Sequence, residues 1–449
     1  MASFDPRTVR HLTDARTSRR RLLQGGAALG LGAALPIVSH SRGAGAQDVT
    51  KLKFSHDKSP WQQFFKDMGD LAQKEININW DVTPYSDTTS YQTALKGALP
   101  TSDTPDLFTW WSGYRLEELY TAGVLEDLTD IWTKAVSDGN APESLGAAFT
   151  FDGKVYSFPL HVSYWVVFYN KKVFADNGIT AAPATWADFT AACDKLKTAG
   201  VTPMASTVVG SWPSFILFEE MVLRTDPQFY LDLTAGKAKY TDPTAVKAMD
   251  TWKGLIDNGY FTSFDAAMDT DWPGMFAQGQ VAMIPVGTWY QSNFTAQNMK
   301  PGEDYDLFIM PNVDPAVTQK VAIVETGALA VAAKSSQIDA AKQFVSWWVS
   351  TDAQTAWSNK LGDTPANTKA VSDNPILKTL LDTLANDHYT LYQRYWEASP
   401  VPIVEGAVTI LQEFMLDTSK EQDVLQKIQD LADTEWAKRG GPAGTPTSS

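Results

Sequence analysis

The stretch LKFSHDKSPWQQFFKDMGDLAQKEININW, residues 52–80, decides the fold class. Residues 52–55 and 76–80 form short β-like runs, and residues 61–74 between them carry apolar side chains at helical spacing. A strand, a helix and a second strand of these lengths make a βαβ unit. Residues 88–97 continue with another helical pattern and residues 106–110 with another strand. This alternation predicts an α/β fold on a largely parallel sheet.

The later part of the chain keeps mixing strands and helices. Residues 152–153 are an Asp-Gly hairpin turn, and residues 165–169 are a continuous apolar run, typical of a strand buried on both faces. Residues 185–197 predict a helix with an acidic residue three positions after its N-cap. The tail from Gly440 is rich in Pro, Gly, Ser and Thr, which predicts disorder over residues 440–449.

Length and charge limit the possible functions. A chain of 449 residues is too long for one compact core, so two lobes are expected. The net charge of -15 disfavours nucleic acid, because phosphate binding needs a basic surface. The same charge disfavours an anionic membrane surface.

The first 46 residues differ from the rest and predict a signal peptide. They hold seven arginines, three of them consecutive at 19–21, ahead of a weakly apolar run at 25–38. That run is too short to span a bilayer but suits the hydrophobic region of a signal. The twin arginine favours the Tat export route, and the sequence AGA at 44–46 predicts a mature chain that starts at Gln47.

The position of the single cysteine bears on disulfide bonds and on membrane anchoring. Cys193 lies far inside the mature chain, so we expect no disulfide within the chain and no lipid anchor next to the signal. No other apolar stretch is long enough to span a membrane. We therefore expect a soluble periplasmic protein, and we expect Cys193 to be a small buried hydrophobe.

Catalysis receives little support from the sequence. The histidines show no metal-ligand spacing, and no nucleophile elbow or phosphate-binding loop is present. We expect no metal and no cofactor. A pair of glycosidase carboxylates remains open, because Asp and Glu are abundant and no local pattern selects two of them.

The tryptophans are the most informative residues. Sixteen are present, and an indole face packs well on the C–H groups of a sugar ring while flanking polar groups take the hydroxyls. Most tryptophans fill cores, and Trp186, Trp252 and Trp347 have the helical spacing expected for that role. Tryptophans on loops at predicted strand ends are the better ligand candidates, because open α/β sheets bind ligands there.

Five blocks of sequence, in order along nearly the whole mature chain, resemble the extracellular solute-binding proteins of carbohydrate ABC importers, which are similar to maltose-binding protein. They are TPDLF with WW (104–111), LEDLTD (125–130), DGKVYSFP with FYNK and PATW (152–186), FAQGQVAM with GTW (276–289), and AAKQFV with LGDTP (340–365). One departure is Thr326-Gly327, where many members have two glycines.

The resemblance implies two α/β lobes joined by three crossings, with a ligand cleft between the lobes. The crossings would lie near residues 158–163, 285–289 and 325–328. The first lobe would combine residues 47–159 with 287–325, and the second would combine 160–286 with 326–439. The resemblance also implies a monomer that delivers its ligand to an ABC permease in the inner membrane.

The candidate ligand residues lie on loops at predicted strand ends or at the expected crossings. They are His56, Asp57, Trp61, Tyr85, Ser86, Trp110, Trp111, His161, Tyr164, Trp212, Trp272, Gly287, Trp289, Glu325, Thr326, Gly327, Asp363 and Arg394. For Trp110 and Trp111 we expect only one of the two to face the ligand. His161 could equally be a buried structural histidine, and Asp363 and Arg394 could be a surface ion pair.

The function predicted from these features is a periplasmic protein that captures a sugar by hinge closure. A polyamine or glycerol phosphate in the same fold is an alternative ligand. A secreted glycoside-active enzyme is the remote alternative.

Overall fold

The computed structural model describes residues 48–443 of the chain. The predicted signal peptide and its cleavage site before Gln47 lie outside the described residues. Of the tail predicted to be disordered, residues 440–443 are described; they form turns and bends, and the N–H of Ala443 donates to the carbonyl of Ala235 at 2.8 Å. No helix within residues 48–443 has the length and apolar character needed to cross a membrane.

The main sheet has nine strands within the described residues, in the order β2-β1-β3-β10-β6-β8-β7, with β11 paired to β10 and β9 paired to β6. Its strands are β1 (Thr50–His56), β2 (Ile78–Pro84), β3 (Leu107–Trp111), β6 (Phe158–Asn170), β7 (Thr202–Met204), β8 (Val281–Gly287), β9 (Tyr305–Phe308), β10 (Val321–Val331) and β11 (Thr390–Gln393). A separate hairpin pairs β4 (Thr150–Phe151) with β5 (Lys154–Val155).

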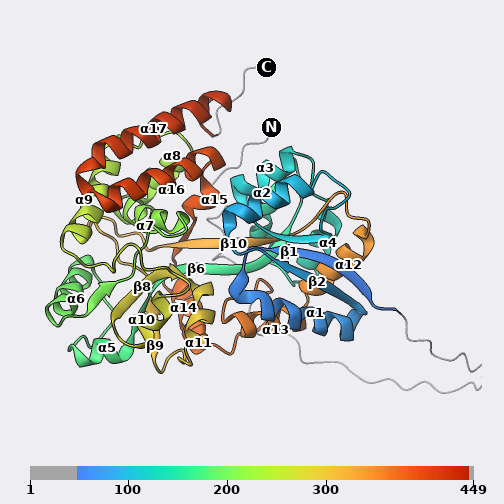
Figure 1. Ribbon diagram of the computed structural model, residues 1–449, viewed down its shortest axis with the longest axis horizontal. Helices are drawn as coiled ribbons and strands as arrows, with labels where there is room; N and C mark the ends of the chain where they lie inside the picture. Colours follow the sequence, from blue (N-terminus) through green and yellow to red (C-terminus); the bar gives the residue numbers. More distant parts are fainter. Residues whose placement is uncertain (1–47, 444–449) are drawn as a thin grey trace, which may run out of the picture.

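The quoted stretch forms the βαβ unit that its pattern predicts. β1 pairs in parallel with β2 and β3, and the ring of Trp80 stacks on Phe54 with centroids 4.0 Å apart. The helices around this end of the sheet, at the right of Figure 1, are α1 (Gln62–Ile76), α2 (Thr88–Ala98), α3 (Gly113–Thr121), α4 (Thr129–Ser137), α12 (Ile338–Trp348) and α13 (Thr351–Leu361).

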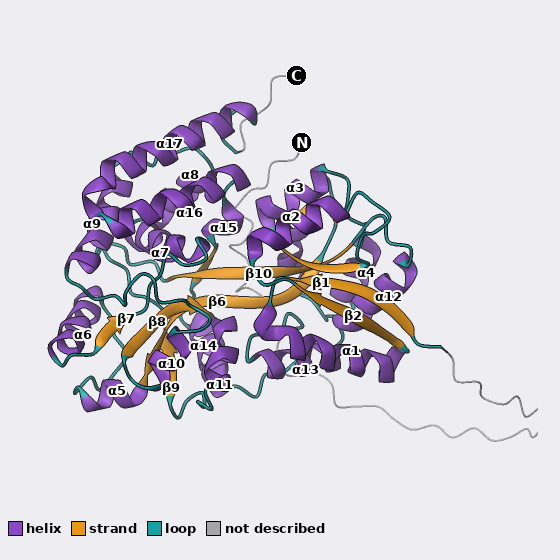
Figure 2. Ribbon diagram, viewed as in Figure 1, coloured by secondary structure: helices purple, strands orange, loops and turns teal. Residues whose placement is uncertain are grey.

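The other end of the sheet contains β7, β8, β9 and β11 and carries more helices, which lie at the left of Figures 1 and 2. They are α5 (Lys171–Asp176), α6 (Trp186–Thr198), α7 (Phe215–Thr225), α8 (Pro227–Thr234), α9 (Pro243–Asp257), α10 (Trp272–Ala277), α11 (Gln291–Ala296), α14 (Pro375–Asn386), α15 (Tyr395–Ala398), α16 (Val401–Leu416) and α17 (Glu421–Lys438). Cys193 on α6 is fully buried, as expected.

Two long strands run through both ends of the sheet (Figure 1). β6 pairs with β10 through its first half and with β8 and β9 through its second half. β10 pairs with β11 at its start and with β3 at its end. Both strands are almost wholly buried, which explains the continuous apolar sequence of residues 165–169.

The sheet is mixed, so the expectation of a largely parallel sheet is wrong. β6 and β10 are antiparallel to each other, and β10 is antiparallel to β3. The contacts also differ from the expected grouping of segments. β9, from residues 287–325, pairs with the far half of β6, whereas α12 and α13, from residues 326–439, contact α1. The physical reason is the direction of β10, which carries the chain from the β11 end to the β3 end.

Candidate ligand-binding site

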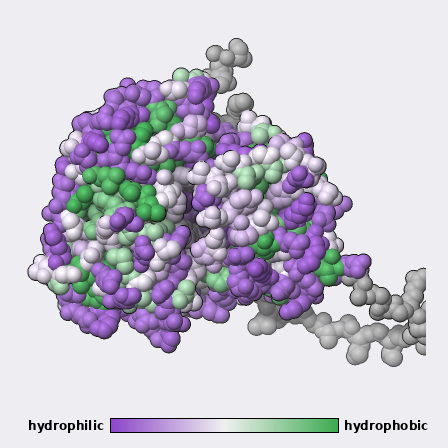
Figure 3. All heavy atoms as spheres, viewed as in Figure 1, coloured by the Kyte–Doolittle hydropathy of each residue, from purple (hydrophilic) through white to green (hydrophobic). Residues whose placement is uncertain are grey.

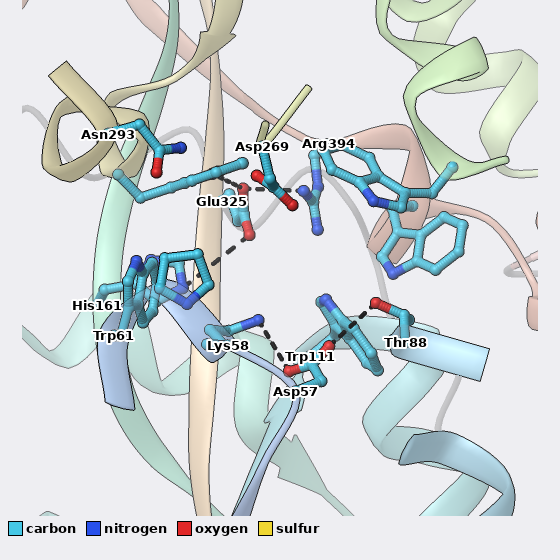
Figure 4. Close-up of a pocket in the computed structure, with 14 residues that line it drawn as sticks. Asp57, Lys58, Trp61, Thr88, Trp111, His161, Asp269, Asn293, Glu325 and Arg394 are labelled. Atoms are coloured by element: carbon cyan, nitrogen blue, oxygen red, sulfur yellow. Dashed lines mark hydrogen bonds and ion pairs between the residues drawn. The ribbon is translucent and has the colours of Figure 1, made fainter. Parts of the chain in front are cut away.

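A cavity of about 120 Å³ lies where the carboxyl ends of β1 and β3 face the loops of the other end of the sheet (Figure 4). Figure 3 shows the surface hollowed between the two ends of the molecule. The cavity is lined by Asp57, Lys58, Pro60, Trp61, Thr88, Trp111, His161, Trp212, Asp269, Trp289, Asn293, Glu325, Arg394 and Trp396. A water position needs roughly 10–15 Å³ of such space, so the cavity holds about as many atoms as one sugar ring.

The loop after β1 brings two charged side chains to the cavity. The N–H of Lys58 donates to Nδ1 of His56 at 3.0 Å, which turns the chain sharply after the strand. Burial lowers the pKa of His56 to about 4, so this histidine is a neutral acceptor at neutral pH. Asp57 pairs with the Lys58 ammonium at 3.2 Å and accepts from the hydroxyl of Thr88 at 3.2 Å.

Glu325 and Arg394 form a buried ion pair on the opposite side of the cavity. Oε2 of Glu325 lies 2.9 Å from Nη1 of Arg394 and accepts from the indole N–H of Trp289 at 3.0 Å. The guanidinium also donates to both carboxylate oxygens of Glu397. Burial alone would lower the pKa of Arg394, but the carboxylates of Glu325 and Glu397 raise it above its ordinary value. Arg394 is therefore always charged.

Five indoles form the walls of the cavity. Trp61 and Trp289 lie edge to face at 6.5 Å, Trp212 and Trp289 lie 6.2 Å apart, and Trp111 meets Trp396 at 6.1 Å. Trp212 and Trp289 are half-buried, so their surfaces remain partly open. This arrangement offers apolar faces beside carboxylates, which is the surface that a sugar ring requires.

Asp269 differs from the other charged groups of the cavity. It is exposed and points into the space above Lys58 in Figure 4. It has no hydrogen-bond or ion-pair partner among residues 48–443 in the structure. The surrounding protein desolvates the carboxyl and raises its pKa, and only the charge of Lys58 opposes this. The carboxylate of Asp269 is therefore placed to accept hydrogen bonds from a ligand in the cavity.

His161 lies on β6, paired with Gly327 of β10, and lines the cavity. Nδ1 of His161 is 2.9 Å from the hydroxyl of Ser163, which donates to Oδ2 of Asp363. Nε2 of His161 has no hydrogen-bond partner and lies 4.0 Å from Oε1 of Glu325. Burial lowers the pKa of His161 well below its ordinary value, so the imidazole is neutral.

Gly327 faces this ring across the pair of strands. A Cβ atom at residue 327 would lie 2.4 Å from Nε2 of His161, closer than side-chain atoms approach each other. Only Thr326 departs from the Gly-Gly pattern. Gly327 is retained, and it allows the close contact between β10 and the ring of His161.

A Gly327→Ala variant is expected to lose about 1–3 kcal/mol of stability, because the buried ring of His161 must move. Urea unfolding would measure this loss. Gly97→Ala on α2 is the matched control, since a Cβ there meets nothing within 4 Å. Equal stability of the 327 variant and the wild type would contradict the close packing.

The structure brings eight of the predicted ligand residues to the cavity: Asp57, Trp61, Trp111, His161, Trp212, Trp289, Glu325 and Arg394. It places the other ten outside the lining: His56, Tyr85, Ser86, Trp110, Tyr164, Trp272, Gly287, Thr326, Gly327 and Asp363. The alternative of a surface ion pair between Asp363 and Arg394 is wrong, because both residues are buried and Arg394 pairs with Glu325.

Local contacts hold Trp110, Trp272 and Gly287 outside the cavity lining. Trp110 and Trp111 point to opposite faces of β3, and the indole N–H of Trp110 donates to the carbonyl of Arg115 at 2.9 Å. Trp272 is buried, and its N–H donates to the carbonyl of Ala266 at 3.0 Å. Gly287 leaves room for the Trp289 ring to fold back, since a Cβ there would lie 2.4 Å from Nε1.

Several remaining predicted residues support the loops around the cavity. Tyr85 and Ser86 follow β2, where the N–H of Tyr85 donates to His56 and Ser86 is exposed. Thr326 donates to the hydroxyl of Ser112 at 3.0 Å, and the N–H of Tyr164 donates to Thr288 at 3.1 Å.

Six lining residues were not predicted: Lys58, Pro60, Thr88, Asp269, Asn293 and Trp396. Lys58, Pro60 and Trp396 are sequence neighbours of predicted residues, so a wider window around each loop would have included them. Asp269 had no such signal, because it lies on a loop before α10 that only the fold brings to the cavity.

Metal binding has no support within the described part of the chain, where no group of three or more His, Cys, Asp or Glu side chains could hold an ion.

Solved structures show the class to which this fold belongs. The bacterial solute receptor AcbH, reported with an exclusive preference for β-D-galactopyranose, superposes with a TM-score of 0.78 at 22% identity, covering 86% of this chain and 99% of the receptor. A chitin oligosaccharide binding protein gives a TM-score of 0.76 at 21% identity, with 86% and 99% covered. The fold is therefore the mixed α/β fold of periplasmic solute-binding proteins.

Sequence comparisons identify the family to which the chain belongs. It belongs to the bacterial extracellular solute-binding protein family, whose profile matches residues 55–355. An ABC transporter extracellular-binding protein of Pyrococcus horikoshii is 27% identical over 364 residues, 79% of each chain. A probable sugar-binding periplasmic protein of Mesorhizobium japonicum is 30% identical over 265 residues, 56% of this chain and 60% of the relative. The family is one of binding proteins, so the enzyme alternative is excluded.

Proposed function

We propose that this protein captures a neutral sugar in the tryptophan-lined cavity and delivers it to the permease of an ABC importer. The observation that carries the proposal is the joint presence of five indole walls and open carboxylate oxygens in a cavity of about 120 Å³. Indoles cover the C–H faces of a sugar ring, and the carboxylates accept from its hydroxyls. Sugar-binding relatives and structural neighbours agree with this ligand class.

We further propose that the chain has two lobes that close around the ligand. The first lobe contains β1–β3, α1–α4, α12 and α13, and the second contains α5–α11 and α14–α17. Asp57 and Trp111 come from the first group and Asp269 and Trp212 from the second. β6, β10 and the segment after β8 are the candidate crossings. A ligand that touches both groups stabilises the closed state by its differential affinity.

The charges of the cavity argue against an anionic ligand such as glycerol phosphate. Lys58 is paired with Asp57, and Arg394 is paired with Glu325 and Glu397. A phosphate would have to break these pairs, whereas a hydroxyl only donates to Asp269 or Glu325. The unpartnered carboxylate of Asp269 favours a polyamine as the second candidate, since an ammonium would neutralise it.

Thermal unfolding with a ligand panel tests the proposal. The panel contains D-galactose, diacetylchitobiose, raffinose, xylobiose, spermidine and glycerol 3-phosphate, each added to protein refolded free of bound ligand. A ligand at 100 times its dissociation constant raises the free energy of unfolding by about 2.7 kcal/mol. We expect stabilisation by one or more sugars, recovered unchanged. Stabilisation by spermidine alone would favour the polyamine, and stabilisation by glycerol 3-phosphate alone would refute both ligands.

The expected route and assembly complete the proposal. The arginines at 19–21 and the apolar run at 25–38 support export by the Tat route to the periplasm. A soluble monomer without a lipid anchor would then meet the permease at the membrane, as the importer class requires.

A further inference from the structure

Three buried polar side chains beside the cavity form a chain of hydrogen bonds that the proposed sugar contacts do not explain. Asp363 follows α13, Ser163 and His161 lie on β6, and all three are buried. Oδ1 of Asp363 already accepts two hydrogen bonds, from the hydroxyl of Thr288 at 2.5 Å and from the N–H of Thr364 at 2.8 Å. Only Oδ2 is left to contact Ser163.

Counting protons along this chain determines the tautomer of His161. With Asp363 ionised, the single hydroxyl proton of Ser163 must go to Oδ2. Ser163 can then only accept from His161, so the proton of the neutral imidazole is on Nδ1. Nε2 carries a bare lone pair, which faces Oε1 of Glu325 at 4.0 Å. That oxygen is the one that neither Arg394 nor Trp289 occupies.

We propose that Asp363, acting through Ser163, sets which nitrogen of His161 carries the proton and thereby whether Oε1 of Glu325 is free to accept from the ligand. Asp363 is a positioning residue, because it lies outside the cavity lining. The part of this inference that concerns ligand binding rests on the proposed function, whereas the part that concerns the tautomer does not.

Protonation of Asp363 reverses every hydrogen bond in the chain. Because Oδ1 is fully used, the proton goes to Oδ2, which then donates to Ser163. Ser163 donates in turn to Nδ1 of His161, and the imidazole proton moves to Nε2. An Nε2–H group attracts the carboxylate of Glu325 and competes with a ligand hydroxyl for Oε1. Proton number balances when one proton enters at Nε2 from the cavity, the Nδ1 proton passes to Ser163, and the Ser163 proton passes to Oδ2 of Asp363.

The surroundings of Asp363 allow this reversal near neutral pH. Burial raises the pKa of Asp363 to about 7, although the hydrogen bonds from Ser163, Thr288 and the Thr364 amide oppose it, and the charge of Glu325 on β10 adds to the rise. The other titratable or charged groups that face the chain are Tyr164 on β6, Arg394 after β11, and Asp57 and Lys58 after β1. Ligand affinity should therefore increase as pH rises through this pKa and fall as pH decreases.

The tautomer can be measured without any ligand by ¹⁵N NMR of the full-length, histidine-labelled protein, with a His161→Asn variant to assign the signals. We expect a proton on Nδ1 of His161 at pH 8.5 and on Nε2 at pH 5.5. Asp363→Asn places an amide donor where Oδ2 stood, so it should hold the proton on Nε2 at both pH values. A fixed Nδ1 proton in the wild type, or an Nδ1 proton in Asp363→Asn at pH 8.5, would overturn the proposal.

A binding measurement separates this inference from the proposed function. Tryptophan fluorescence titration with D-galactose and diacetylchitobiose should give about tenfold weaker binding at pH 5.5 than at pH 8.5, since a hydrogen bond to a charged group is lost. Asp363→Asn should bind weakly at both pH values, and Ser163→Ala should remove the pH dependence of the tautomer. If neither sugar binds but the tautomer switches, the proposed ligand fails and the proton relay stands. A tautomer switch with pH-independent binding would refute its effect on Glu325.

Discussion

An Arg394→Ala variant is expected to lose about 3–5 kcal/mol of stability and all measurable sugar binding. Removing one partner of a buried ion pair leaves an uncompensated charge, and here two carboxylates, Glu325 and Glu397, lose the same guanidinium. All three side chains are buried, so water cannot replace the lost partner without opening the structure. Urea unfolding measures the stability, and calorimetric titration with the sugar found in the panel measures the binding.

The deficit of this variant should depend on pH in a defined direction. Burial raises the pKa of Glu397 to about 7 although Arg394 opposes the rise, so removing Arg394 should raise this pKa further in the folded state. The folded variant then gains stability relative to the wild type as pH falls and loses it as pH rises. Arg394→Lys keeps the positive charge but removes the guanidinium that contacts both Glu325 and Glu397, so it separates the effect of charge from that of the paired contacts. Lys172→Ala, which breaks an exposed pair with Asp176, should leave stability unchanged. A loss below about 1 kcal/mol at pH 8.5 would contradict this account of the ion pair.

A Trp289→Ala variant is expected to bind sugar about 30- to 1,000-fold more weakly while remaining folded. Its indole is a half-buried wall of the cavity between Trp61 and Trp212 and also donates to Glu325. Removing a central tryptophan from a binding site costs about 2–4 kcal/mol, which corresponds to this loss of affinity. Calorimetric titration gives the affinity, and thermal unfolding without ligand confirms that the variant is folded.

Two further variants separate the contributions of this indole. Trp289→Phe keeps an aromatic face but removes the N–H that reaches Glu325, so it should bind more tightly than the alanine variant and more weakly than the wild type. Trp186→Ala removes a half-buried indole of α6 that lies tilted against Phe189 outside the cavity lining, and should leave affinity unchanged. A Trp289→Ala affinity within fivefold of the wild type would show that the ligand lies elsewhere.

The sequence predicts well the parts of the site that depend on local order. Residues directly after a parallel strand lie at the sheet edge whatever the rest of the chain does, which is why the loop at Asp57 and Trp61 was found. Trp110 and Trp111 point to opposite faces of β3 because successive side chains of a strand alternate. Which of the two faces the cavity depends on how β3 is oriented in the sheet, and the sequence does not give that orientation. Asp269 depends on the packing of distant segments, and no spacing in the sequence reports such packing.

The grouping of segments into lobes depends on packing in the same way. Whether residues 287–325 lie at one end of the sheet or the other depends on the direction and register of β10. A buried strand such as β10 has an apolar sequence whichever way it runs, so its sequence does not determine its orientation in the sheet. The resemblance implies where the chain crosses between lobes, but it does not specify which helices pack on which end of the sheet.

The buried position of Cys193 makes the protein convenient to convert into an optical sensor. Burial raises the pKa of this thiol to about 12, so it stays protonated and shielded from maleimide dyes at neutral pH. A cysteine introduced at an exposed position of α2 and another at an exposed position of α9 would then be the only sites labelled among residues 48–443. Energy transfer between the two dyes would report the distance between the proposed lobes directly, in solution, as sugar is added.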